Sequence, residues 1–130
     1  MRQLLVAIAA LALTGAVQPA QLTRTPEAQA KLDKWLAGRV PVEKQNCIPM
    51  HATFSPIGID DYTVLFRDGP RIWRNDLRRS RDAGRLDRQS QFVTESRVGR
   101  VCAGDDFGVL QDGELVGTGT LGEFVLYKKP

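Results

Sequence analysis

The pattern of apolar and polar residues begins with an unbroken apolar run over residues 4–13, directly after Arg2. Small and polar residues follow the run, an order that is typical of a secretory signal peptide. The run is shorter than the roughly 20 apolar residues that a membrane span requires. We therefore predict that residues 1–20 are a signal peptide, cleaved after residue 16 or residue 20, and that the mature chain has no membrane span.

After the predicted signal peptide, apolar residues recur at the spacing of an α-helix. Thr25 can cap a helix, Pro26 suits its first turn, and Glu27 favours the positive end of the helix dipole. The apolar residues that share one face at this spacing are Ala28, Leu32, Trp35 and Leu36. Because Gly38 can end the helix and Pro41 cannot continue it, we predict a lead-in and one amphipathic helix over residues 21–46.

From residue 47 onward, short runs rich in β-branched and aromatic residues alternate with turn signals. The predicted strands cover residues 48–54, 62–67, 71–75, 91–95, 97–102, 107–111, 114–116 and 123–128. Asp112-Gly113 is a strong hairpin signal, whereas Asp68-Gly69 is weaker because Pro70 cannot donate to a strand ladder. Residues 78–90 are polar without an apolar period, which predicts a mobile surface loop.

These patterns predict a mainly β fold for residues 47–130. Seven or eight short strands in so short a chain are typical of a small antiparallel barrel or sandwich, with the N-terminal amphipathic helix packed on one side or end.

The two cysteines, Cys47 and Cys102, both lie in the predicted mature chain. An even count in an exported protein predicts a disulfide, because the compartment is oxidising. The alternative is a metal site, since Cys47 and His51 have a possible ligand spacing and Cys102 could join them. A structural tetrahedral site needs four ligands, however, and the sequence has no further Cys or His. We predict the disulfide and no metal site.

The charge is unevenly distributed, although the formal net charge is only +3. Residues 67–100 contain ten arginines and five acidic residues, whereas residues 101–127 contain five acidic residues and no basic one. So mild a surplus, on an exported chain, does not favour nucleic acid as a partner. The basic segment can pair with the acidic segment inside the fold, or present a cationic face to an anionic partner.

The sequence predicts no catalytic residue and no cofactor. Residues 117–122 match G-x-G-x-x-G, but residues 123–127 resemble a strand, so the helix of a dinucleotide site is missing. The glycines instead suit a bulge or a tight bend. The carboxylate pairs Asp60-Asp61 and Asp105-Asp106 lie at predicted strand ends, where aspartate commonly caps turns.

One predicted strand favours a contact surface. If Ile72 faces the core, strand alternation places Arg71, Trp73 and Asn75 on the opposite face. An exposed tryptophan among arginines suits an anionic or aromatic partner. The predicted binding residues are Arg71, Trp73, Arg74 and Arg78. In the alternative reading, Trp73 covers a loop and these arginines pair with Asp60, Asp61 or Asp68.

Five segments of the chain resemble a family of small exported proteins of alphaproteobacteria that is classed as a domain of unknown function. The matching segments are Cys47-Ile48 and residues 62–67, 73–78, 101–105 and 121–127, in an order and spacing that fit over residues 47–129. Members often carry two further cysteines, in regions where this chain has residues 80–84 and 119–120 instead. The resemblance thus implies that a second disulfide is absent and that Cys47 pairs with Cys102. It also implies export and a compact β domain, and it adds no reaction.

Together these features predict an exported envelope protein, periplasmic or extracellular, that acts as a non-enzymatic binding or structural module. Its expected partner is an envelope protein or an anionic envelope component, bound through residues 71–78. The alternative is a small periplasmic hydrolase or metal-handling protein that uses His51 and nearby carboxylates.

Overall fold

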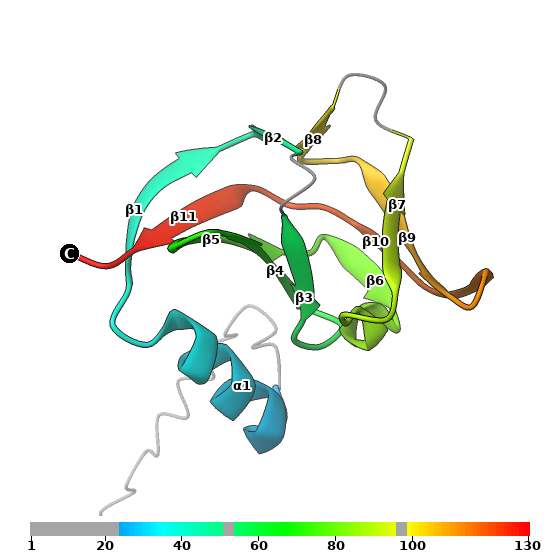
Figure 1. Cartoon of the computed structure of the whole chain (residues 1–130), viewed down its shortest axis with the longest axis horizontal. Helices are drawn as coiled ribbons and strands as arrows, with labels where there is room; N and C mark the ends of the chain where they lie inside the picture. The colour runs from blue at the N-terminus through cyan, green and yellow to red at the C-terminus, as the bar shows by residue number, and fades with distance from the viewer. Residues whose placement is uncertain (1–23, 51–53, 96–98) are drawn as a thin grey trace, which may run out of the picture.

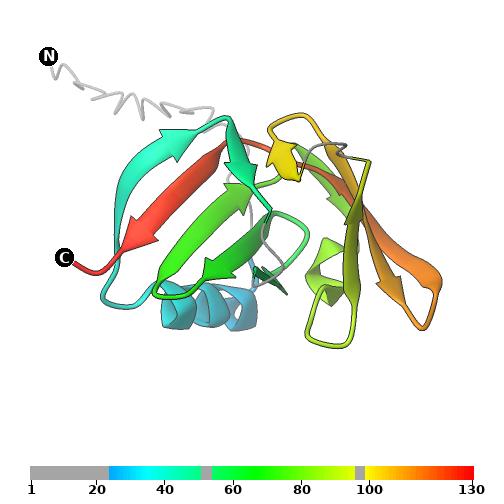
Figure 2. The ribbon, with the colours of Figure 1, turned by 45° about the horizontal axis from the view of Figure 1, so that its top comes forward.

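The computed structural model describes residues 24–50, 54–95 and 99–130 of the chain. This part is mainly β and sandwich-like, with one helix near its beginning (Figure 1). The helix lies on one face of a five-stranded antiparallel sheet, and the core on the other face is shared with a four-stranded sheet (Figure 2). Within the described ranges neither sheet closes on itself, so the predicted mainly β fold is confirmed as a sandwich.

The strands form three antiparallel sheets. In spatial order, the five-stranded sheet consists of β1 (Val40–Gln45), β11 (Phe124–Lys128), β5 (Arg71–Asp76), β4 (Thr63–Asp68) and β3 (Ser55–Gly58). The four-stranded sheet consists of β6 (Arg79–Arg81), β10 (Glu114–Thr120), β9 (Asp106–Gln111) and β7 (Gln91–Thr94). The short pair is β2 (Cys47–Pro49) with β8 (Arg100–Cys102). Helix α1 spans Pro26–Leu36, and a 3-10 turn, η1, spans Ala83–Arg85.

Helix α1 begins where its sequence predicts. The hydroxyl of Thr25 accepts a hydrogen bond from the backbone N–H of Ala28 at 3.2 Å, and Pro26 occupies the first turn. Ala28 and Leu32 are buried against Leu65 of β4 and Ile72 of β5. The predicted amphipathic helix is therefore confirmed, and it covers the five-stranded sheet.

The central strands of this sheet are buried on both faces. In β4, Val64 and Phe66 face the core shared with the four-stranded sheet, while Leu65 faces α1. All three are fully buried. Aromatic rings fill the shared core, where Phe92 of β7 meets the ring of Phe66 edge-on at a centroid distance of 5.3 Å.

Strands β1 and β3 were not predicted from the sequence. Strand β1 lies within the segment predicted as lead-in and helix, and pairs with β11 with a register shift between Pro41 and Glu43. All six of its residues are exposed, so no apolar alternation marks it. Strand β3 follows the predicted strand 48–54, of which residues 51–53 lie outside the described residues; residues 96–98, in the segment leading to β8, do as well.

The prediction of a surface loop at residues 78–90 is wrong. Strand β6 pairs with β10, and Ala83 and Leu86 are buried in the core between the sheets. Close backbone approach makes this possible: a Cβ on Gly58 would lie 2.7 Å from the carbonyl oxygen of Ala83. Two buried apolar residues in an otherwise polar segment form no periodic pattern, so the sequence pattern did not predict their burial.

The glycine-rich segment belongs to a strand. Residues 117–120 lie in β10, which runs past the predicted end at residue 116, and the register shifts between Leu115 and Gly117. This shift is consistent with the predicted bulge.

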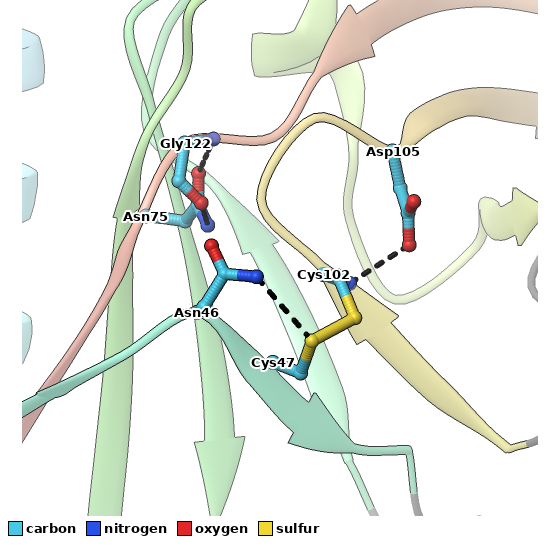
Figure 3. The surroundings of a disulfide bond; sticks show 6 residues. All are labelled: Asn46, Cys47, Asn75, Cys102, Asp105 and Gly122. Carbon is cyan, nitrogen blue, oxygen red and sulfur yellow. Dashed lines mark hydrogen bonds between the residues drawn. A yellow bond between two sulfur atoms is a disulfide. The ribbon is translucent and has the colours of Figure 1, made fainter.

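A disulfide between Cys47 and Cys102 joins β2 to β8 (Figure 3). The two cysteines are directly opposed in the β2–β8 pair. Strand β2 continues β1 of the five-stranded sheet after Asn46, and β8 leads after three residues into β9 of the four-stranded sheet. The backbone N–H of Cys102 also donates to the carboxylate of Asp105 at 2.8 Å. The predicted disulfide is confirmed, and it connects the two main sheets.

A buried amide holds one of the points where the chain passes between the two main sheets. The chain passes from β10 to β11 through Gly122, where the side chain of Asn75 forms two hydrogen bonds (Figure 3). Its Nδ2 donates to the carbonyl of Gly122 at 2.8 Å, and its Oδ1 accepts from the N–H of Gly122 at 2.7 Å. A Cβ at this glycine would lie 2.1 Å from the carbonyl oxygen of Asp76, so only glycine fits.

We expect Asn75→Ala to lower the free energy of unfolding by about 2–4 kcal/mol, because two buried backbone groups of Gly122 lose their partner. Urea denaturation followed by circular dichroism measures the change. Asn46→Ala is the matched control, since Asn46 is exposed and its amide contacts only the sulfur of Cys47. Equal stability of the two variants would contradict the role of Asn75.

We expect Cys47→Ser/Cys102→Ser to lower the free energy of unfolding by about 4 kcal/mol, the chain-entropy estimate for a loop of this length. Wild-type protein treated with a reductant should reach the same stability, whereas the double variant should not respond to it. A wild type whose unfolding midpoint is indifferent to reduction would refute this expectation.

Candidate functional site

The structure does not bring the predicted binding residues together on one exposed face. In β5, Ile72 and Arg74 lie on the side of α1, whereas Arg71 and Trp73 lie on the opposite side. Trp73 is only 5% exposed and belongs to the core between the sheets. The expectation of an exposed tryptophan is therefore wrong, because both faces of β5 are covered.

Two of the predicted arginines are paired with carboxylates. Arg71 contacts Asp68 at 2.7 Å across the β4–β5 hairpin, a pairing that the alternative reading allowed. Arg74 donates to Asp76 at 3.0 Å. Burial alone would lower the pKa of Arg74, but its hydrogen bond to Asp76 and the charge of that carboxylate outweigh burial, and the pKa is raised. Arg78 is exposed and sits elsewhere, beside Gly104.

The carboxylate of Asp60 has a structural role at the start of α1. Arg24 donates to Asp60 at 2.8 Å and also to the hydroxyl of Thr63, which in turn donates to Asp76 at 2.7 Å. The other oxygen of Asp60 accepts from the backbone N–H of Tyr62 and of Thr63. Arg24, Asp60 and Thr63 thus tie the beginning of the helix to the sheet, and Asp60 caps a turn as its position predicted.

Within the described ranges, the residues that the alternative hydrolase or metal-handling protein would use do not form a site. His51 lies outside them, and both cysteines are consumed by the disulfide. Across residues 24–50, 54–95 and 99–130, no three His, Cys, Asp or Glu side chains gather closely enough to hold a metal ion. In the same residues no helix is both long and apolar enough to cross a membrane.

A hollow of about 520 Å³ lies between α1, the edge strand β3 and the segment 86–90. Its apolar lining comes from Trp35, Phe54, Pro56, Ile57 and Leu86. Its charged lining comes from Lys31, Arg67, Asp87 and Arg88. Three cations and one carboxylate therefore border an apolar floor, an arrangement typical of a site for an amphipathic ligand. We call this hollow the α1–β3 cavity.

Helix α1 supplies one wall of the α1–β3 cavity. Lys31 and Trp35 are four residues apart, so they lie on the same side of the helix. The ammonium of Lys31 donates to the carbonyl of Gly58 in β3 at 2.7 Å. Arg67, near the end of β4, places its guanidinium 6.0 Å from the centroid of the Trp35 ring. Packing of the helix on the sheet thus positions an aromatic ring and two cations.

The outer edge of β3 is largely closed to another strand. The N–H of Gly58 donates to the carbonyl of Leu86 at 2.9 Å, and its carbonyl is taken by Lys31. Alternation directs Pro56 to the same edge, where it offers a carbonyl but no N–H. The cavity therefore suits a compact ligand better than an added β-strand.

The opposite wall of the α1–β3 cavity is a tight turn over residues 87–90, whose backbone binds the carboxylate of Asp87. One oxygen of Asp87 accepts from the backbone N–H groups of Gln89 and Ser90 at 2.8 and 3.0 Å. The hydroxyl of Ser90 accepts from the N–H of Asp87 at 2.7 Å and donates to its carbonyl. The side chain of Arg88, by contrast, makes no hydrogen bond or ion pair with any described residue. Its guanidinium is available to an anion.

Sequence reasoning did not find the α1–β3 cavity. Lys31, Arg67 and Arg88 are far apart in the chain and belong to a helix, a strand and a turn. The available signal was the i, i+4 pair Lys31 and Trp35, which placed a cation beside the apolar stripe of the predicted helix. Arg88 lay in the segment that was expected to be a surface loop.

Comparisons of the chain with protein-family models, with curated proteins and with solved structures find no match. The resemblance to the exported family therefore stays a prediction.

Proposed function

We propose that the chain is a small exported binding module whose α1–β3 cavity takes an amphipathic anion, a compact group with a carboxylate, sulfonate or phosphate and an apolar part. One observation carries the proposal: Lys31, Arg67 and Arg88 surround an apolar floor that includes Trp35. This proposal keeps the anionic envelope component predicted from the sequence and moves its site away from residues 71–78.

The electrostatics of the cavity favour an anion. Asp87 is the single carboxylate of the lining, and backbone N–H groups of its own turn already bind it. Arg67 and Arg88 keep guanidinium donors that can form charge-assisted hydrogen bonds with a bound anion. Burial of the apolar part of the ligand against the half-buried Trp35, Pro56 and Ile57 would supply the remaining affinity.

The lining favours binding over catalysis. Among the described residues its hydroxyls belong to Ser55 and Ser90. The hydroxyl of Ser90 accepts from the N–H of Asp87 and donates to the carbonyl of Asp87. A serine held in this way stabilises the turn and is poorly placed to act as a nucleophile. We therefore assign the cavity a binding role.

Export, to the periplasm or the outside of the cell, is part of the proposal. A disulfide that connects two sheets persists in an oxidising compartment and is rare in the cytosol. The apolar run at residues 4–13 would supply the signal for this route.

We expect Arg67→Gln/Arg88→Gln to weaken binding of the probe anilinonaphthalene sulfonate roughly tenfold, because two charge-assisted contacts to the sulfonate are lost. Fluorescence titration of the folded protein measures the dissociation constant. Arg81→Gln is the matched control, since Arg81 is an exposed arginine outside the α1–β3 cavity and should leave the affinity unchanged.

The neutral probe phenylnaphthylamine separates charge from apolar burial. It has the same ring system without the sulfonate, so it should bind weakly and equally to all three proteins. Equal binding of the sulfonate by the double variant and the wild type, at unchanged unfolding midpoints, would refute the proposed site.

We expect the protein recovered from the periplasm of an expressing bacterium to lack residues 1–16 or 1–20 and to be two hydrogens lighter than the reduced chain. Intact mass spectrometry measures both changes. A full-length mass with two free thiols would contradict export and leave the cavity proposal to be judged by the titrations alone.

A further inference from the structure

The outer face of the four-stranded sheet is the side turned away from the core. Register places residues in rows across β6, β10, β9 and β7. One row consists of Arg81, Thr118, Gly108 and Val93, and the next consists of Arg79, Thr120 and Asp106, with Glu95 beside it at the end of β7. The neighbouring residues Phe107 and Val109 of β9 point to the core instead. We call the surface formed by these two rows and Leu115 the outer face.

Charge on the outer face is divided between its two edges. Arg79 and Arg81 lie on β6 at one edge, while Glu95 and Asp106 lie toward the β7 edge. Arg79 donates to the hydroxyl of Thr120 at 3.1 Å, which donates to Asp106 at 2.6 Å. The side chains of Arg81 and Glu95 form no hydrogen bond or ion pair with any residue that the structure describes. The face is therefore dipolar, with an unpaired charge near each edge.

Exposed apolar side chains lie between the charged edges. Leu115 is 61% exposed and Val93 is 37% exposed, the former being the most exposed large apolar residue of the described ranges. Both lean over Gly108, where a Cβ would lie 2.8 Å from a methyl group of Leu115 and 3.1 Å from one of Val93. An apolar centre between opposite charges is typical of a protein contact surface.

We propose that the outer face pairs with the same face of a second copy of this chain, about a two-fold axis that runs along the strands between β9 and β10. In a two-fold interface the same patch serves both partners, so it must be complementary to itself. This axis carries the β6 edge of one copy onto the β7 edge of the other. Arg79 of one copy then lies opposite Glu95 of its partner, Arg81 lies one row away within reach of the same carboxylate, and the contact repeats on the other side.

The same axis explains the position of Leu115. Because its side chain reaches from β10 over Gly108 of β9, it lies close to the axis and meets its own counterpart. Burial of this exposed residue and of Val93 supplies the apolar part of the contact. The segregated charges oppose any arrangement that places like edges together, and so fix the orientation.

The size of the outer face predicts weak association. The four strands have three to seven residues each. At about 3.3 Å per residue and about 4.8 Å between strands they span on the order of 300 Å², less than half of the roughly 800 Å² per partner that stable complexes bury. We therefore expect a dissociation constant on the order of 0.1–1 mM and a monomer in dilute solution.

Sedimentation equilibrium of the oxidised chain, followed up to about 1 mM, tests the proposal with two charge-reversed variants. Arg81→Glu places a second carboxylate close to Glu95 of the partner copy, and Glu95→Arg places a further cation close to Arg79 and Arg81 of the partner copy, so each variant alone should associate at least tenfold more weakly than the wild type. An equimolar mixture of the two should regain the wild-type association as a heterodimer. Leu115→Ser should weaken association without changing the unfolding midpoint.

Three outcomes would overturn the proposal: a wild type that stays monomeric throughout this range, variants that associate as the wild type does, or a mixture that associates no better than its components. Binding of anilinonaphthalene sulfonate should be the same in all these variants, because none of the substituted residues lines the α1–β3 cavity. The self-association proposal and the cavity proposal therefore succeed or fail independently.

Discussion

The paired hydrogen bonds between Asn75 and Gly122 are the contact on which the sandwich depends. At this point the chain leaves the four-stranded sheet after β10 and enters the five-stranded sheet as β11, next to β5. A backbone that crosses the core between sheets has no strand neighbour, and an unpaired amide there is unfavourable. Asn75 provides the donor and the acceptor that a neighbouring strand would provide, and the missing side chain of Gly122 lets the crossing pass against β5.

The Cys47–Cys102 disulfide supplies the second connection, since β2 and β8 continue into strands of different main sheets. Together with the short passage from β5 to β6, these contacts at separate points restrict how the sheets can move relative to each other. The aromatic core between them can then pack in a single arrangement. The two surfaces proposed for binding lie outside this frame: the α1–β3 cavity at one edge of the five-stranded sheet, and the outer face of the four-stranded sheet.

The sequence was sufficient to predict an element where the chemistry of neighbouring residues determines it. Thr25 and Pro26 marked the start of the helix, and Asp112-Gly113 marked the hairpin between β9 and β10. The sequence was insufficient where contacts between distant segments decide which residues are buried. Strand alternation indicates which residues share a face, but it does not show that both faces of β5 are covered, and so Trp73 was expected to be exposed. Ala83 and Leu86 anchor a polar segment without any period, and the cavity residues come from separate elements. Such placements depend on packing between distant segments, which no local pattern encodes.

Four exposed or half-buried arginines fall into two pairs that differ in their neighbours. Of those in β5, Arg71 lies beside Asp68, which the β4–β5 hairpin brings close, and Arg74 lies beside Asp76 on its own strand, so their charge is used within the fold. Arg81 and Arg88 lie on β6 and on the turn after η1, where the chain offers their side chains no acceptor within the described residues. An unpaired cation at the surface stays hydrated until an anion displaces the water. The segment 78–90 therefore holds cations that the described fold leaves unpaired, whereas Arg71 and Arg74 of the basic strand that the sequence favoured already face carboxylates.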